Sequence, residues 1–168
     1  FSAPLHEAAE AGDAIRTARL LKAGADIEAV DADAYTALHL ASGMGSVEVA
    51  RLLLNHGARA DSTDENGETP LMLAAHVGHA DVARLLLDFG ASVAAESATG
   101  YRPLHMAAEQ GQAEVAELLL ERGADVAAVT HSGATALHWS AHHDRAAVAA
   151  LLIRHGAPLD ARDSDGET

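Results

Sequence analysis

The feature that most limits the fold of this sequence is a phrase of about ten residues that returns every 33 positions. The phrase reads APLHEAAEAG at 3–12, TALHLASGMG at 36–45, TPLMLAAHVG at 69–78, RPLHMAAEQG at 102–111 and TALHWSAHHD at 135–144. A Gly-Ala pair keeps the same step and starts at residues 24, 57, 90, 123 and 156. A repeat of this length indicates a stack of supersecondary units, each of which buries its faces only against its neighbours.

The unit that starts at Thr69 illustrates the expected local structure. Thr69 is a favourable N-cap, and Pro70 occupies the first helical position, where its missing N–H does no harm. The apolar residues that follow predict a short helix ending near Gly78, and we expect a second helix over 80–90. Gly90 suits the left-handed residue that ends such a helix.

The segment between the helices of successive units has no helical periodicity. Residues 91–100, for example, are typical of an extended turn that leads to the next N-cap. Because the helices are too short to be stable alone in water, stacking must stabilise them. We therefore predict an all-α solenoid of helix-turn-helix units with projecting, hairpin-like loops.

The repeat divides the whole chain into one array. The units cover about 1–33, 34–66, 67–99, 100–132 and 133–165, and a sixth unit begins at 160–168. Arg16 and Arg19 replace apolar residues of the later units, which gives the first unit the polar outer face that a terminal repeat needs. The sequence starts with Phe1 instead of Met and stops before a sixth helix, so we expect a piece of a longer protein that continues past Thr168.

This pattern resembles the ankyrin repeat, whose signature is a TPLHxAAxxGH phrase followed by VxxLLLxxGAD. The resemblance extends over nearly all 168 residues and recurs in five units. It implies a non-catalytic scaffold that binds partner proteins through its concave face and its projecting turns. Repeat arrays of this kind share an architecture and not an activity, so the resemblance names no partner.

The charge of the chain narrows the class of partner. It carries 11 Lys and Arg against 25 Asp and Glu, a net charge of −14. Such a surface repels phosphate, so we expect no nucleic acid and favour a basic protein or peptide. The alternative is that the acidic surface only keeps the protein in solution.

Composition also bears on compartment and assembly. No apolar run approaches the ~20 residues that span a bilayer, so we expect no membrane insertion. The chain has no cysteine, which fits a reducing compartment, and we expect an intracellular protein, cytoplasmic or nuclear. We expect it to be a monomer.

The recurring histidines are candidates for metal ligands. One register position is occupied in turn by His6, His39, Met72, His105 and His138. Units stack about 10 Å apart, whereas zinc ligands lie ~2 Å from the ion, so these side chains cannot share one metal. In the family that the chain resembles, this histidine forms hydrogen bonds within the turn and between units. His138 and His142 have a spacing seen in zinc sites, but nothing completes the set, and we expect no metal and no cofactor.

No enzyme motif is present in the sequence. It has no G-x-S-x-G, no P-loop and no evident pair of carboxylates in a cleft. Trp139 could suggest an aromatic cage for a methylated lysine. Its register position is otherwise occupied by Glu7, Leu40, Leu73 and Met106, so lining of the core or of the concave face is the better interpretation.

Function is expected at positions that packing does not fix, which are the turn tips and the concave face. The candidate partner-binding residues are Asp33, Tyr35, Met44, Glu65, Glu68, His76, Val77, Phe89, Tyr101, Glu109, His142 and His143. Both tyrosines fall at equivalent loop positions, where we expect exposed anchors for a partner. Apolar spots with an acidic rim suit a peptide that carries Lys or Arg, although scattered surface residues are the alternative.

The sequence thus predicts an acidic protein-interaction module. Two alternatives stay open at this point. The chain could read a Lys/Arg-rich tail, such as a histone tail, or it could be a structural spacer within a larger protein and bind nothing.

Overall fold

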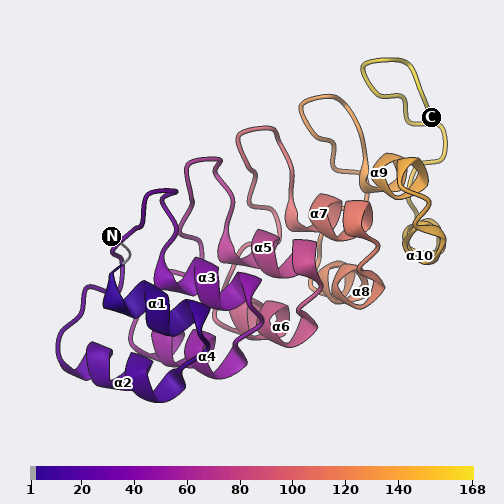
Figure 1. The fold of residues 1–168 in the computed structure, drawn as a ribbon. Helices are drawn as coiled ribbons and strands as arrows, with labels where there is room; N and C mark the ends of the chain where they lie inside the picture. Colours follow the sequence, from indigo (N-terminus) through magenta and orange to yellow (C-terminus); the bar gives the residue numbers. More distant parts are fainter. Residues whose placement is uncertain (1–2) are drawn as a thin grey trace.

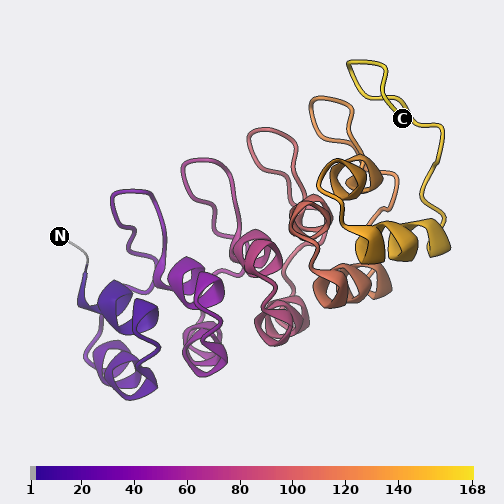
Figure 2. The same ribbon diagram turned by 45° about the vertical axis from the view of Figure 1, so that its right-hand side comes forward.

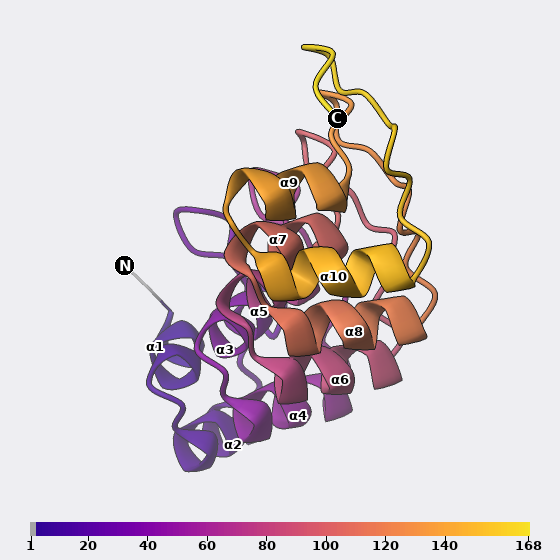
Figure 3. The same ribbon diagram turned by 90° about the vertical axis from the view of Figure 1, so that its right-hand side faces the viewer.

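The computed structural model describes residues 3–168, so the expected start of the array at Phe1 lies outside the described residues. These residues form ten α-helices in two layers (Figures 1 and 3). The odd-numbered layer contains α1 (Pro4–Glu10), α3 (Ala37–Gly43), α5 (Pro70–Val77), α7 (Pro103–Gln110) and α9 (Ala136–His142). The even-numbered layer contains α2 (Ala14–Lys22), α4 (Val47–Asn55), α6 (Ala80–Asp88), α8 (Ala113–Glu121) and α10 (Ala146–Arg154).

The predicted all-α solenoid is confirmed. Each helix pair packs on the next, and the two ends of the chain lie at opposite ends of the stack (Figure 1). The loops between units all project from the odd-numbered side (Figure 2). Within residues 3–168 these loops form no strand, and only Val129 and Thr135 pair in an isolated antiparallel bridge.

Local chemistry starts and ends the helices largely as the sequence predicts. The Thr69 hydroxyl accepts a hydrogen bond from the backbone N–H of Met72 at 3.3 Å, and Pro70 opens α5. Gly78 ends α5 with φ +94°, and Gly90 follows α6 with φ +88°. The second helix of this unit ends at Asp88, two residues before the expected boundary.

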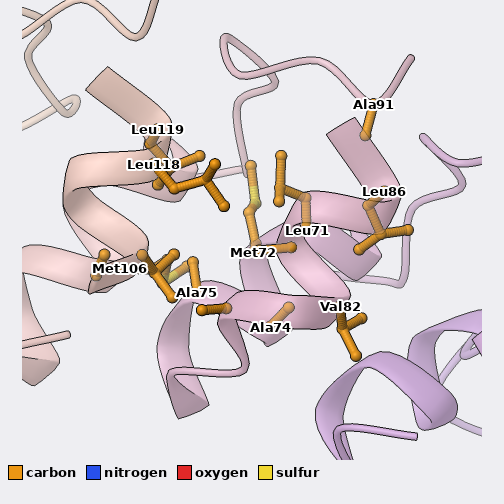
Figure 4. Close-up of a cluster of buried hydrophobic side chains, with 14 of the residues drawn as sticks. Leu71, Met72, Ala74, Ala75, Val82, Leu86, Ala91, Met106, Leu118 and Leu119 are labelled. Atoms are coloured by element: carbon orange, nitrogen blue, oxygen red, sulfur yellow. The ribbon is translucent and has the colours of Figure 1, made fainter. Parts of the chain in front are cut away.

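The core consists of small and branched apolar side chains. Leu71, Met72, Ala74, Ala75 and Leu86 are fully buried in the third unit (Figure 4). The alanines let helices of neighbouring units approach closely, and the longer side chains fill the space between the layers. No aromatic side chain among residues 3–168 is part of this buried apolar set.

The recurring histidines have the structural role that the resemblance implied. Nε2–H of His39 donates to the Glu68 carbonyl at 3.1 Å, and Nε2–H of His105 donates to the Ala128 carbonyl at 3.0 Å. Nδ1 accepts from the backbone N–H three residues earlier, at Thr36 and Arg102. Burial lowers the pKa of both histidines, so each stays neutral and links its own turn to a carbonyl outside its helix.

A second series of side chains connects the N-cap of each of the helices α6, α8 and α10 to the end of the odd-numbered helix of the preceding unit. His79 donates to the carbonyl of Gly43 at 3.1 Å, Gln112 to the carbonyl of Val77 at 3.0 Å, and Arg145 to the carbonyl of Glu109 at 3.0 Å. The three donors share one register position and differ in chemistry. Each satisfies a carbonyl that the helix end would otherwise leave unpaired.

Two positions depart from the glycine pattern. Ala34 and Asp144 adopt left-handed backbone, with φ +63° and +56°, where other units have glycine. In the later loops, a backbone bond joins neighbours: Ala98 N–H donates to the Asn66 carbonyl at 2.8 Å. The equivalent backbone bond between the loop that contains Ala34 and the next loop is absent among the described residues. A Cβ at Gly67 would lie 3.1 Å from the Ala98 nitrogen. Because glycine has no Cβ, the neighbouring loops can approach closely enough to form this backbone bond.

Candidate protein-interaction surface

The projecting loops and the odd-numbered helices together form one surface, which we call the inner face. Between the third and fourth units this face is hollowed. Loop residues Glu68 and Tyr101 line the hollow from above the helices, and Leu73 of α5 and Met106 and Glu109 of α7 line it from the helix layer. The hollow therefore lies where the sequence predicts a concave binding face.

The two tyrosines differ from expectation, because they are half-buried and not exposed. Each directly precedes the N-cap of an odd-numbered helix, and its ring lies against the histidine of that helix. The ring centroids are 5.6 Å apart for Tyr35 and His39 and 6.0 Å apart for Tyr101 and His105. Tyr101 also packs against the hydrophobic core. The tyrosines therefore form the base of each loop.

The exposed loop tips carry acidic residues instead. Asp33 and Glu65 are both exposed in the turns that precede α3 and α5. The Asp64 carboxylate is buried and accepts hydrogen bonds from the backbone N–H groups of Asn66 and Glu68, each at 2.8 Å. These bonds fix the turn and hold Glu68 at the edge of the hollow.

An aromatic cluster that sequence reasoning did not assemble lies between the fourth and fifth units. The rings of Tyr101 and Trp139 are 5.1 Å apart, and His143 stacks on Trp139 at 6.2 Å. His142 contacts His143 edge-on at 5.0 Å. Trp139 is half-buried and lines the inner face, in agreement with the preferred interpretation of its register position. The signal that could have found the cluster is that the only tryptophan of the chain shares the register of Leu73.

The electrostatics of the hollow are negative. Burial raises the pKa of Glu68, and the nearby Asp64 carboxylate raises it further. Burial and then Glu109 raise the pKa of the Tyr101 hydroxyl. The one cationic candidate beside Glu109 is His143, whose Nε2 lies 3.6 Å from a Glu109 carboxylate oxygen. No lysine or arginine in the described part of the chain pairs with Glu68.

The predicted apolar spots do not form one strip. Met44 and Val77 are 57% and 48% exposed at the C-terminal ends of α3 and α5, on the odd-numbered layer. Phe89 is 42% exposed but follows α6, so it belongs to the even-numbered layer. His76 is exposed and lines the hollow. The hollow thus brings together His76, Glu68, Tyr101 and Glu109, and leaves Phe89 outside.

The arrangement of the histidines and the lengths of the helices bear on metal binding and membrane insertion. Among residues 3–168, no three His, Asp or Glu side chains converge as metal ligands. His138, the possible zinc partner of His142, donates through Nε2 to the Glu167 carbonyl at 3.1 Å and accepts at Nδ1 from Thr135. No helix in the described region has both the length and the apolar character needed to cross a bilayer.

Comparison with protein-family models agrees with the fold. A model described as ankyrin repeats (3 copies) matches residues 5–97 and 56–130, and a single ankyrin repeat model matches residues 132–164. Comparison with curated proteins gave no significant match. Proteins built from these repeats are generally non-catalytic and mediate protein–protein interactions. The family matches and the stacked helix pairs agree over most of the sequence, and the chain therefore belongs to the ankyrin repeat family.

Proposed function

We propose that this chain binds a basic segment of a partner protein along the inner face. The observation that carries the proposal is the hollow between the third and fourth units, where Glu68 and Glu109 lie beside Tyr101 and pair with no lysine or arginine of residues 3–168. A half-buried carboxylate without a cation is unfavourable, so a cationic partner gains free energy by pairing with it.

The overall charge supports the same conclusion at longer range. A net charge of −14 attracts a basic segment from solution and raises its rate of association. Exposed Asp33 and Glu65 extend the acidic rim along the loops. Apolar contacts with Met44 and Val77 would add affinity that does not depend on charge.

The two alternatives make different predictions. The aromatic cage that Trp139 could suggest would need several ring faces around one methylated lysine, whereas Tyr101 and Trp139 contact each other at 5.1 Å. Unmodified Lys/Arg-rich tails, including histone tails, remain within the proposed class. A structural spacer binds no basic segment at all, which makes the proposal directly testable.

The test uses designed peptides of about 12 residues, because an extended chain advances about 3.3 Å per residue and the units repeat about every 10 Å. One peptide alternates Lys or Arg with Leu, and a matched peptide replaces every basic residue with Gln. We expect the basic peptide to bind and to shift backbone NMR signals of the loops and odd-numbered helices. Equal binding of both peptides, or shifts confined to the even-numbered helices, would contradict the proposal.

A further inference from the structure

The hollow between the third and fourth units has an equivalent place between the fourth and fifth units, where two aromatic rings are in contact. At the equivalent place between the fourth and fifth units, Tyr101 and Trp139 occupy the registers of Glu68 and Met106, and their ring centroids are 5.1 Å apart. Between the third and fourth units the corresponding side chains are Glu68 and Met106, and the space in front of Tyr101 stays open. The pair of side chains at these two register positions, Glu68 with Met106 or Tyr101 with Trp139, therefore decides whether the place forms a hollow or an aromatic contact.

The open hollow combines two kinds of wall. Glu68 and Glu109 supply carboxylates from the loop and from α7, while Leu73, Met106 and Tyr101 supply apolar and aromatic surface. The carboxylates favour a cation that has hydrogen-bond donors. The apolar walls favour a group that loses its hydration water at low cost. A small, strongly hydrated ammonium group meets only the first requirement, since it retains its water.

The charge balance of the hollow is incomplete. Glu68 has no ion pair or side-chain hydrogen bond among residues 3–168 that neutralises it, and burial raises its pKa. Glu109 has only His143 nearby, at 3.6 Å. By contrast, the Glu96 carboxylate in the neighbouring loop is paired with Arg102 at 2.6 Å. An arginine thus already neutralises a carboxylate next to the hollow, but the two carboxylates that line the hollow lack such a partner.

We propose that this hollow receives an arginine side chain of the partner, with its guanidinium group against the Tyr101 ring and its N–H groups donating to Glu68 and Glu109. The planar guanidinium group stacks on aromatic rings, donates to carboxylates in a fixed fork and is weakly hydrated. The inference rests on the proposed function, because it assigns one residue type of the basic segment to one place on the inner face.

The test uses three small probes with the same backbone: N-acetyl methylamides of arginine, lysine and citrulline. Citrulline keeps the shape of arginine and lacks its charge. Binding is followed by NMR, with the indole N–H of Trp139 as a unique reporter beside Tyr101, since it is the only tryptophan of the chain. We expect saturable shifts of Tyr101, Glu68 and Glu109 with the arginine probe, and at least about threefold weaker binding of lysine.

Variants make the assignment specific. Glu68→Gln is expected to weaken binding of the arginine probe about tenfold, because it removes one member of a partly desolvated ion pair. Glu121→Gln, at an exposed site in the even-numbered layer, makes the same chemical change outside the hollow and should leave binding unchanged. His76→Lys, at an exposed position of the hollow wall, places a tethered cation beside Glu68 and should also weaken binding, with little risk to folding.

The outcomes separate this inference from the proposed function. The inference is overturned if the citrulline or lysine probe binds as tightly as the arginine probe. It is also overturned if the Glu68→Gln and His76→Lys variants bind the arginine probe with wild-type affinity. If the basic peptide still shifts the NMR signals of the inner face in that case, the proposed function stands without the arginine assignment. If the arginine probe shifts the hollow residues and the basic peptide does not bind, the proposed function fails instead.

Discussion

The hollow between the third and fourth units and the aromatic contact between the fourth and fifth occupy equivalent places on the same backbone. The first is lined by Met106 and stays open, whereas Trp139 fills the second against Tyr101. The helices that carry them, α7 and α9, both begin directly after an N-cap residue with extended backbone, Arg102 and Thr135. The comparison teaches that the repeat determines where a site can form, while the variable side chains, here Glu68 with Met106 against Tyr101 with Trp139, determine whether one does.

The largest expected effect tests the shared scaffold of both places. Leu86 is fully buried in α6 and contributes to neither surface. Leu86→Ala is expected to lower the free energy of unfolding by about 2–5 kcal/mol, because the cavity cannot collapse completely. Binding of the basic peptide to the folded fraction should be unchanged. Denaturant unfolding together with peptide titration measures both, and a loss of affinity without loss of stability would contradict the separation of core and site.

Closing the open hollow is the direct test of the difference between Met106 and Trp139. Met106→Trp places the larger ring in the hollow that Glu68 lines and should exclude a guanidinium group, with a loss of about 2 kcal/mol in binding of the basic peptide. Because Met106 is nearly buried, some overpacking is expected, at about 1–3 kcal/mol of folding stability. Calorimetric titration of the folded variant measures the change. Unaltered affinity would show that the peptide does not enter the hollow.

Acidification is expected to loosen the histidine links that hold the loop bases of both places. The folded-state pKa values of His39 and His105 are lowered by burial, so these groups take up protons more readily when unfolded. Their contribution to stability is therefore full above about pH 6.5, the unfolded value, and decreases as the pH falls below it. Urea unfolding between pH 7.5 and 5 measures this trend. His39→Gln with His105→Gln should flatten it, and an unchanged slope in that double variant would contradict the assignment.

The smallest effect is expected at the loops. Ala34 has φ +63° where later units have glycine, and the backbone bond between neighbouring loops is absent there in the described chain. Ala34→Gly should raise the free energy of unfolding by about 1 kcal/mol, because glycine accepts the left-handed region without a clash. Asp144→Gly should raise the free energy of unfolding by a smaller amount, since aspartate tolerates the left-handed region better than alanine. Thermal melting of both variants measures the gain, and destabilisation by Ala34→Gly would refute the explanation.

Much of the fold was predictable because it depends on local chemistry repeated five times. Thr69, Pro70 and Gly78 each fix the start or end of α5 through a bond or a backbone angle that the sequence predicts. The candidate site was less predictable. The repeat gives the register of Tyr101 but not the direction of its ring, and the contact with Trp139 joins residues 38 positions apart. That contact depends on how successive units rotate relative to one another, which no single unit encodes.

The exposure of the tyrosines illustrates the same limit. Loop position alone favours exposed anchors, whereas the structure turns Tyr35 and Tyr101 toward the histidine four residues later. A half-buried ring then serves two purposes, because it packs on the core and also forms a wall of the inner face. The sequence alone suggested that a tyrosine either packs in the core or lies exposed on a loop. The half-buried rings place the candidate site at the loop bases instead of the loop tips.

The most direct test of a local, acidic binding face compares two charge reversals. Glu68→Lys lies in the hollow and Glu121→Lys lies at an exposed position of the even-numbered layer, and both change the net charge by the same amount. Stopped-flow association of the basic peptide is measured over a range of salt concentrations. We predict slower association, lower affinity and a flatter salt dependence for Glu68→Lys, with Glu121→Lys close to wild type. Equal effects of the two reversals would contradict the account, because the acidic surface would then act only through its total charge.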